Sequence, residues 1–233
     1  MNTLWNAMVS VASWPIETVA SAIEGTGAWA YGWAVILVAA GWRLLLLPLL
    51  VRQGNRRILT ARWHAVHSRG RDMRDREQRA AVRRQVTDSL AGQVAPTGRL
   101  AGVALALQVL AIGAVAIWSR GSEAAAEHGF AGLARLDAMT ATLGAAGWAW
   151  ALALGLAFLA TALVTHGAAG NTAGHQGVID RAITPAFFTG LALLLPSGVT
   201  VAFVAGMVVS MTGLVIASAS VPTGARATAG QVA

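Results

Sequence analysis

Five long apolar segments constrain this chain more than any other feature of its sequence. They cover residues 29–51, 100–118, 142–164, 182–195 and 199–217, and a Pro-Ser-Gly break at 196–198 separates the last two. A helix needs about 20 apolar residues to cross the hydrocarbon core of a bilayer. Because 182–195 is short for a crossing, we expect its helix either to begin near residue 178 or to lie in a thinned part of the bilayer. The sequence predicts an all-α membrane protein with five transmembrane helices.

The low charge of the chain agrees with lipid as its main solvent. Only 12% of the residues are charged, whereas soluble domains carry roughly 25%. All 17 basic residues are arginine and there is no cysteine. The absence of lysine and cysteine excludes Schiff-base lysines, thiolate nucleophiles, disulfides and zinc–thiolate sites. An enzyme is the weakest of the function classes considered, and we expect neither an enzymatic activity nor a cofactor.

The arginines predict the orientation of the chain in the membrane. Residues 52–99 hold twelve arginines against four acidic residues, a net charge of +8, whereas residues 119–141 have a net charge of −1. Positively charged loops stay in the cytoplasm. We therefore expect the N-terminus outside and the C-terminus inside. Because the alanine and arginine bias suggests a GC-rich bacterial genome, the expected location is the bacterial plasma membrane.

Residues 1–28 form a predicted extracytoplasmic segment at the membrane interface. They lack the basic start of a secretory signal peptide. Ile16, Val19, Ala20 and Ile23 fall on one face of a helix, which is typical of an amphipathic helix lying in the interface.

The basic insert 52–99 is predicted to be a cytoplasmic helical hairpin. Two short apolar stripes have helical spacing, with a break at 68–70 between them; they are Leu59, Trp63 and Val66, and Val82, Val86 and Leu90. Each arginine near an anionic leaflet adds about 1 kcal/mol of attraction, so we expect the hairpin to bind anionic lipids. A nucleic-acid partner is not expected, since only Trp63 could stack on bases. Residues 219–233 are a short cytoplasmic tail.

Arg43 is the exceptional residue of the first apolar segment. It precedes Arg52 by nine residues, or about 13 Å of helix, and so lies within the hydrocarbon layer. An arginine there costs about 2.5–3.5 kcal/mol and should face the bundle interior or a wet cavity. None of the five segments contains Asp or Glu. We expect water, hydroxyls, amides or a visiting acid to hold the guanidinium.

Few polar side chains could accompany Arg43; they are Gln108, Thr161, Thr189, Ser210 and Thr212. For any single hydroxyl, a hydrogen bond to the carbonyl one turn earlier is the favoured interpretation. Gln108 differs because lipid cannot satisfy the four hydrogen-bonding sites of a primary amide. It is therefore expected to face inward.

These features together resemble the YidC/Oxa/Alb superfamily of membrane-protein insertases over about residues 14–218. In that family an arginine precedes a proline by five residues in the first core span, as Arg43 and Pro48 do. A second family pattern, MP…FPAG, is matched by Thr184-Pro185 and Leu195-Pro196-Ser197-Gly198. The chain departs from the family where Ala160-Thr161 stands for a glutamine pair and Ala202-Phe203 for Tyr-Trp. It is identified as a divergent member.

The resemblance implies an insertase-type bundle with a polar groove that receives clients. In this chain, residues 100–218 would then form the other four transmembrane helices. The residues expected to bind clients are Arg43, Gln108, Thr161, Phe203 and Ser210. The implied function is an ATP-independent membrane insertase and chaperone for newly made membrane proteins. A Sec translocon is a second candidate partner. Ribosome docking is not expected, because the tail contains only Arg226.

Three alternatives stay open on the residues alone. A small anion transporter or channel could use Arg43, although the five segments show no internal repeat. A degenerate paralogue could serve as a structural partner. The weakest alternative is a metal site at His166, His175 and Asp180 or at His64 and His67, since neither spacing matches a known ligand pattern.

Overall fold

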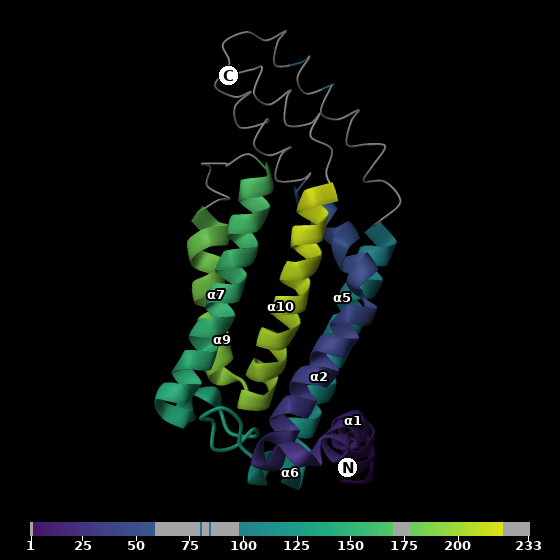
Figure 1. Ribbon diagram of the computed structural model, residues 1–233, viewed down its shortest axis with the longest axis vertical. Helices are drawn as coiled ribbons and strands as arrows, with labels where there is room; N and C mark the ends of the chain where they lie inside the picture. The colour runs from purple at the N-terminus through teal and green to yellow at the C-terminus, as the bar shows by residue number, and fades with distance from the viewer. Residues whose placement is uncertain (1, 59–79, 81–83, 85–97, 170–177, 221–233) are drawn as a thin grey trace.

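All the elements of secondary structure longer than an isolated bridge are helices in the part of the chain that the structure describes. This confirms the predicted all-α class. The computed structural model describes residues 2–58, 80, 84, 98–169 and 178–220. Its bundle consists of α2 (Ala30–Leu45), α5 (Gly98–Gly121), α7 (Gly144–Ala169), α9 (Thr184–Leu194) and α10 (Ser197–Ser220). In Figure 1, α10 lies between the α7–α9 pair and the α2–α5 pair.

Two to three helical segments in the described part of the chain are long and apolar enough to cross a membrane. Thr140–Ala168 and Ser197–Ala219 qualify as single helices, and a third qualifies if Ala30–Leu45 and Leu47–Ile58 count as one bent span. Ala106–Gly121 is apolar but shorter. The five crossings thus stay a prediction. In the described residues before the short fourth segment, helical backbone runs from Val178 through the π-helical turn η3 (Ile179–Ile183) to α9.

The first apolar segment is bent. Its two helices, Ala30–Leu45 and Leu47–Ile58, meet at an angle of 68°. Pro48 explains the position of the bend, because it has no N–H to donate and its ring would clash with the carbonyl of Leu44 in a straight helix. The second helix extends seven residues beyond the predicted end at 51, and Ile58 packs on Leu214 of α10. The predicted span 29–51 is therefore divided into two helices by a bend at Leu46.

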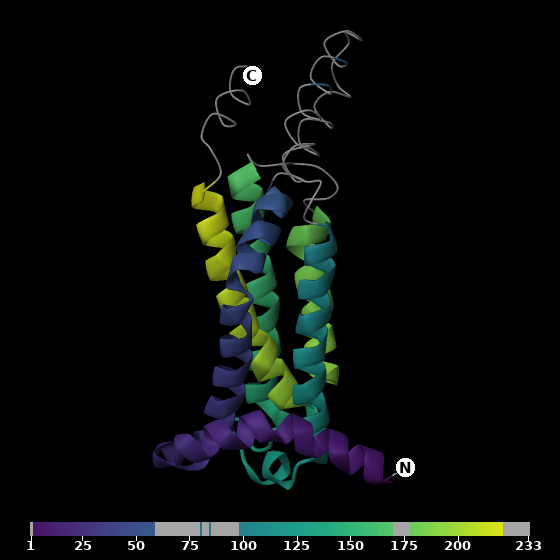
Figure 2. The same cartoon turned by 90° about the vertical axis from the view of Figure 1, so that its right-hand side faces the viewer.

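Helix α1 (Asn2–Ala22) lies across one end of the bundle, roughly perpendicular to the other helices (Figure 2). We call this end the α1 end, and η1 (Glu24–Trp29) connects it to α2. Ile16 and Ala20 are buried and Val19 packs against the same core, while Glu17 is exposed. Three of the four residues of the predicted face thus pack on the bundle, while the location of α1 in a membrane interface stays a prediction. A second apolar set on α1 stays exposed: Leu4, Trp5, Met8, Val11 and Trp14.

The connection from α5 to α7 folds back onto the α1 end, where it forms a cap with α6 (Glu123–Glu127) and η2 (Thr140–Leu143). Hydrogen bonds tie it to the break between α9 and α10: the Ser197 amide donates to Ala138 O (2.9 Å), and the Thr140 amide donates to Leu195 O (3.0 Å). The buried hydroxyls of Thr140 and Thr200 lie 3.0 Å apart. The Pro-Ser-Gly break thus anchors the cap.

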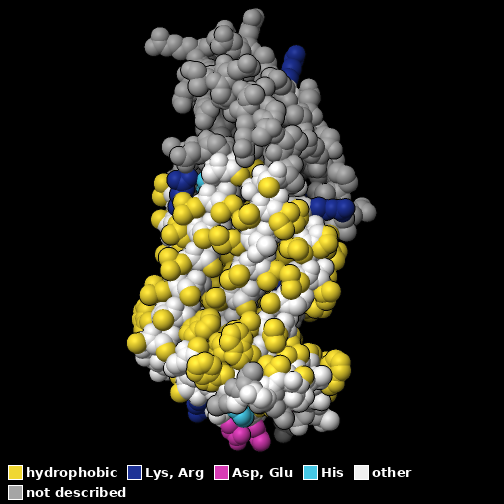
Figure 3. Space-filling view, in the orientation of Figure 1, with side chains coloured by type: hydrophobic (Ala, Val, Ile, Leu, Met, Phe, Trp, Pro, Cys, Tyr) yellow, Lys and Arg dark blue, Asp and Glu magenta, His cyan; other side chains and the backbone are white. Residues whose placement is uncertain are grey.

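The surface of the bundle is apolar between its two ends. Figure 3 shows apolar side chains over the flank of the bundle, with charged side chains towards its ends. Large apolar side chains are exposed on several helices, among them Leu156 on α7, Phe187 on α9 and Val208 on α10. An exposed apolar surface of this extent is typical of a surface that contacts other proteins or a membrane.

The predicted hairpin 52–99 falls largely outside the described residues. Residues 52–58 belong to the helix that follows the bend, and residues 59–79, 81–83 and 85–97 are not described. The same holds for residues 170–177 and for the tail after Ser220. The hairpin and the tail stay predictions.

Candidate site at Arg43

Arg43 reaches from α2 into the bundle and contacts α10. Its side chain is buried, with 8% of the residue surface exposed. The Nη1 atom donates a hydrogen bond to Oγ of Ser210. That hydroxyl in turn donates to the carbonyl oxygen of Gly206, 3.0 Å away and one turn earlier in α10. The expectation that Arg43 faces inward and is held by a hydroxyl is confirmed.

Gly206 provides the surface on which the guanidinium lies. A methyl group added at Gly206 would come 2.9 Å from Nε of Arg43 and 3.2 Å from its Cζ. Real Cβ contacts are rarely this short, so any side chain at position 206 would displace the guanidinium. Gly206 and Ser210 therefore hold Arg43 together, one by its lack of a side chain and the other by its hydroxyl.

Arg43 has no carboxylate partner among the described residues. Two ion pairs lie elsewhere in the structure: Arg135 with Asp137, and His166 with Asp180. The first lies in the exposed cap, where Asp137 raises the pKa of Arg135 by a hydrogen bond and by its charge. In the second, Nε2 of the buried His166 lies 3.1 Å from Oδ2 of Asp180; His175, His64 and His67 are outside the described residues.

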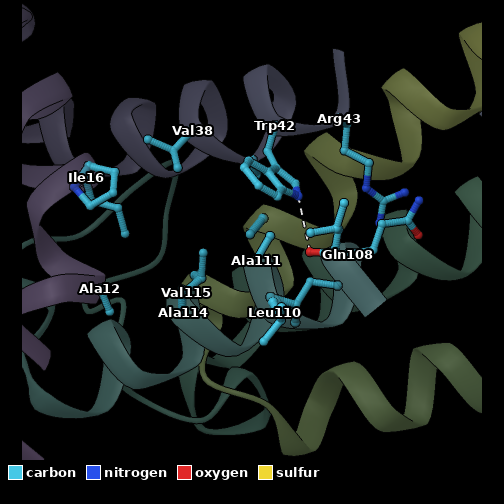
Figure 4. A pocket seen from close by; sticks show the side chains of 15 residues that line it. Ala12, Ile16, Val38, Trp42, Arg43, Gln108, Leu110, Ala111, Ala114 and Val115 are labelled. Carbon is cyan, nitrogen blue, oxygen red and sulfur yellow. Dashed lines mark hydrogen bonds between the residues drawn. The ribbon is translucent and has the colours of Figure 1, made fainter. Parts of the chain in front are cut away.

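A cavity of about 460 Å³ lies beside Arg43, between α1, α2 and α5 (Figure 4). Figure 4 shows Arg43 and Gln108 at one end of the cavity, with Ala12 and Ile16 of α1 at the opposite end. Leu110 lines the cavity and is 67% exposed, which places the opening at the bundle surface. Ligand sites commonly measure about 300–1,000 Å³, so the cavity is large enough to hold a ligand.

Trp42 bridges the two helices that form the side walls. Its indole Nε1 donates a hydrogen bond to Leu107 O of α5, 3.2 Å away (Figure 4). Trp42 was not among the site residues predicted from the sequence. Four-residue spacing could have revealed this wall, since Val38 and Trp42 share a face of α2 and Leu107 and Ala111 share a face of α5.

Two predicted site residues lie away from the cavity. Thr161 is on α7, where its hydroxyl donates to Ala157 O at 2.8 Å. Phe203 is on α10 and packs between two apolar clusters. Of the five predicted residues, Arg43 and Gln108 line the cavity. Ser210 does not line it but bonds Arg43 from α10.

The other predicted hydroxyls bond the carbonyl one turn earlier in their own helix, which was the favoured interpretation. Thr189 donates to Pro185 O at 2.9 Å and Thr212 to Val208 O at 3.2 Å, each one turn earlier in its own helix. These bonds satisfy the hydroxyl without a ligand. Ser210 differs from them because it also accepts the hydrogen bond from Arg43.

No protein-family model matches this chain, and no curated protein matches it in sequence.

Proposed function

We propose that this protein is a membrane-protein insertase and chaperone that helps client transmembrane segments enter the bilayer without ATP. One observation carries the proposal: a buried guanidinium, without a carboxylate partner in the described part of the chain, lies at the polar end of a cavity that opens at an apolar surface. A cation placed in this way attracts an acid that arrives from outside the protein.

The proposed site binds the acidic end of a client only transiently. At 4 Å and an effective dielectric constant of about 20, opposite charges attract by roughly 4 kcal/mol before desolvation. This attraction offsets part of the cost of taking a carboxylate into the membrane, yet it allows release. Burial of the client's apolar span in lipid then drives its exit, and no covalent step is needed.

The proposed orientation places the α1 end outside and the basic insert 52–99 in the cytoplasm of a bacterial cell, with five crossings of the plasma membrane. The cap and α1 close the outer end in this orientation, so a client enters from the cytoplasmic side. The insert binds anionic lipids and receives newly made clients at the membrane surface. A Sec translocon is a further candidate partner.

The test is insertion into liposomes that contain the purified full chain. Wild-type protein is expected to insert clients with acidic translocated ends faster than protein-free liposomes, and Arg43→Ala is expected to lower that rate several-fold. Arg135→Ala is the matched control, because it removes an exposed arginine of the cap. Insertion by Arg43→Ala at the wild-type rate contradicts the proposal.

An anion-flux assay on the same liposomes separates the insertase from the rival functions. Flux that depends on Arg43 without any client, combined with no insertion, favours an anion transporter. A wild-type protein that neither inserts clients nor conducts anions favours a structural paralogue. The insertase proposal expects insertion without client-independent flux.

A further inference from the structure

The cavity beside Arg43 is polar at one end only. Apart from Arg43, Gln108 and the indole N–H of Trp42, its lining side chains are apolar. On α5 this apolar wall runs from Ala111 to Val115, the last residue of that helix to line the cavity. Gln108 and Val115 are seven residues apart, which corresponds to about 10 Å or two helical turns. Between a ligand bound to Arg43 and helix α1, the cavity therefore offers an apolar space about 10 Å long.

We propose that this asymmetry defines the client class: segments in which an acidic residue follows a short apolar stretch at the leading, α1-facing end. The inference rests on the proposed insertase function and narrows it. The carboxylate lies at Arg43 and Gln108, and the apolar stretch ahead of it fills the space between α1, α2 and α5.

Charge complementarity selects the acid. Arg43 is buried and is not part of an ion pair among the described residues. Its guanidinium has five N–H donors, and Nη1 is the one that bonds Ser210. Gln108 adds an amide at the same end of the cavity (Figure 4). A carboxylate accepts several such hydrogen bonds.

The apolar walls select the client residues that precede the acidic residue. Ala12 and Ile16 from α1, Val38 from α2 and Val115 from α5 offer no side-chain donor or acceptor. A leading serine or asparagine would lose its water there without gaining a hydrogen bond, which is unfavourable. A leucine or alanine would bury apolar surface instead. The exposed Leu110 lies at the opening, so an apolar stretch can leave sideways into lipid.

Disulfide cross-linking tests the inference directly, because the chain has no cysteine of its own. Ala111→Cys places one thiol on the apolar wall of the full-length protein in liposomes. The clients are peptides with one cysteine in the leading stretch and a glutamate at a fixed position behind it. In one client the six leading residues other than that cysteine are leucine and alanine, and in the other they are serine and asparagine.

We expect the apolar-led client to cross-link to position 111 at least tenfold more than the polar-led client. Replacing the client glutamate by glutamine, or adding Arg43→Ala to the protein, is expected to remove most of that signal. Leu156→Cys, on an exposed face of α7 outside the cavity, is the matched control and should show no preference that depends on Arg43.

Equal cross-linking of the two clients at position 111 overturns the inference, even where both are inserted through Arg43. Selective cross-linking supports it, and if neither client is then inserted, the insertase function fails while the binding preference stands. Cross-linking that is selective but independent of both the client glutamate and Arg43 also overturns it, because the acid would then have no role.

Discussion

Gly206 of α10 lies directly beneath the guanidinium of Arg43 on α2, where an added methyl group would come 2.9 Å from Nε. The charge is therefore positioned by the absence of a side chain on the neighbouring helix. Small residues in membrane helices often allow close approach of two backbones. Here a small residue allows close approach of a backbone to a charge.

Gly206→Ala is expected to separate stability from function. The methyl group displaces the flexible guanidinium and lowers client insertion several-fold, while the helix gains up to about 1 kcal/mol in propensity. Insertion rate and unfolding in detergent measure the two effects. Gly190→Ala on α9 is the control, because a methyl group there meets nothing within 4 Å. If Gly206→Ala inserts clients at the wild-type rate, the position of the guanidinium is not critical.

Ser210→Ala removes the hydroxyl that accepts a hydrogen bond from Arg43. Hydrogen bonds to charged groups contribute about 1.5–3 kcal/mol, so we expect a loss of stability of that size and weaker insertion of acidic clients. Ser210→Thr keeps the hydroxyl and should retain most of both. Equilibrium unfolding in detergent mixtures measures the difference. An Ala variant as stable as the Thr variant would show that the bond contributes little.

The length of the apolar segments predicted the positions of individual helices, because these positions do not depend on how the helices pack together. The third predicted span, 142–164, corresponds to Thr140–Ala168, and the fifth, 199–217, corresponds to Ser197–Ala219. The inward orientation of Arg43 was also predictable, because an arginine in the middle of an apolar span is expected to face the bundle interior or a wet cavity. These features follow from residue type and solvent, with no knowledge of which helices become neighbours.

Features that depend on contacts between helices could not be predicted from the sequence. Gly206 resembles any other glycine until α2 packs against α10, and α1 lines the cavity only because it lies across the bundle end. The bend at Leu46 was signalled by Pro48, but its angle of 68° was not. Thr161 and Phe203 were assigned to the groove by resemblance to a family whose residues differ at those positions, and the structure places both outside the cavity.

Gly155 on α7 provides a test of the packing between α7 and α9. An added methyl group would lie 2.0 Å from Oγ1 of Thr189 and 3.2 Å from Pro185 O. Gly155→Ala is expected to destabilise the protein by about 1–3 kcal/mol, the usual cost of overpacking. Adding Thr189→Ala should restore part of the loss by removing the closest atom.

A double-mutant cycle measured by unfolding tests this coupling. Gly167→Ala in the same helix is the control, because its methyl group meets nothing within 4 Å. Additive effects of the two substitutions would mean that Gly155 and Thr189 are not in close contact.

The cap at the α1 end depends on two buried hydroxyls. Oγ1 of Thr140 donates to Leu195 O at 2.9 Å and lies 3.0 Å from Oγ1 of Thr200, which donates to Ala192 O at 3.2 Å. Thr140→Val and Thr200→Val keep the shape of each side chain and remove its hydroxyl. Each is expected to cost about 0.5–1.5 kcal/mol and to speed proteolysis between residues 128 and 139.

The double variant should lose less than the sum of the single losses, because the contact between the two hydroxyls is removed by either change. Thr142→Val is the matched control: it is exposed, lies in the same turn and bonds only Met139 O, so its effect should stay within about 0.5 kcal/mol. Unfolding and proteolysis of the four variants measure these effects. Full additivity, or an equal loss in Thr142→Val, would show that the cap is not stabilised by this pair.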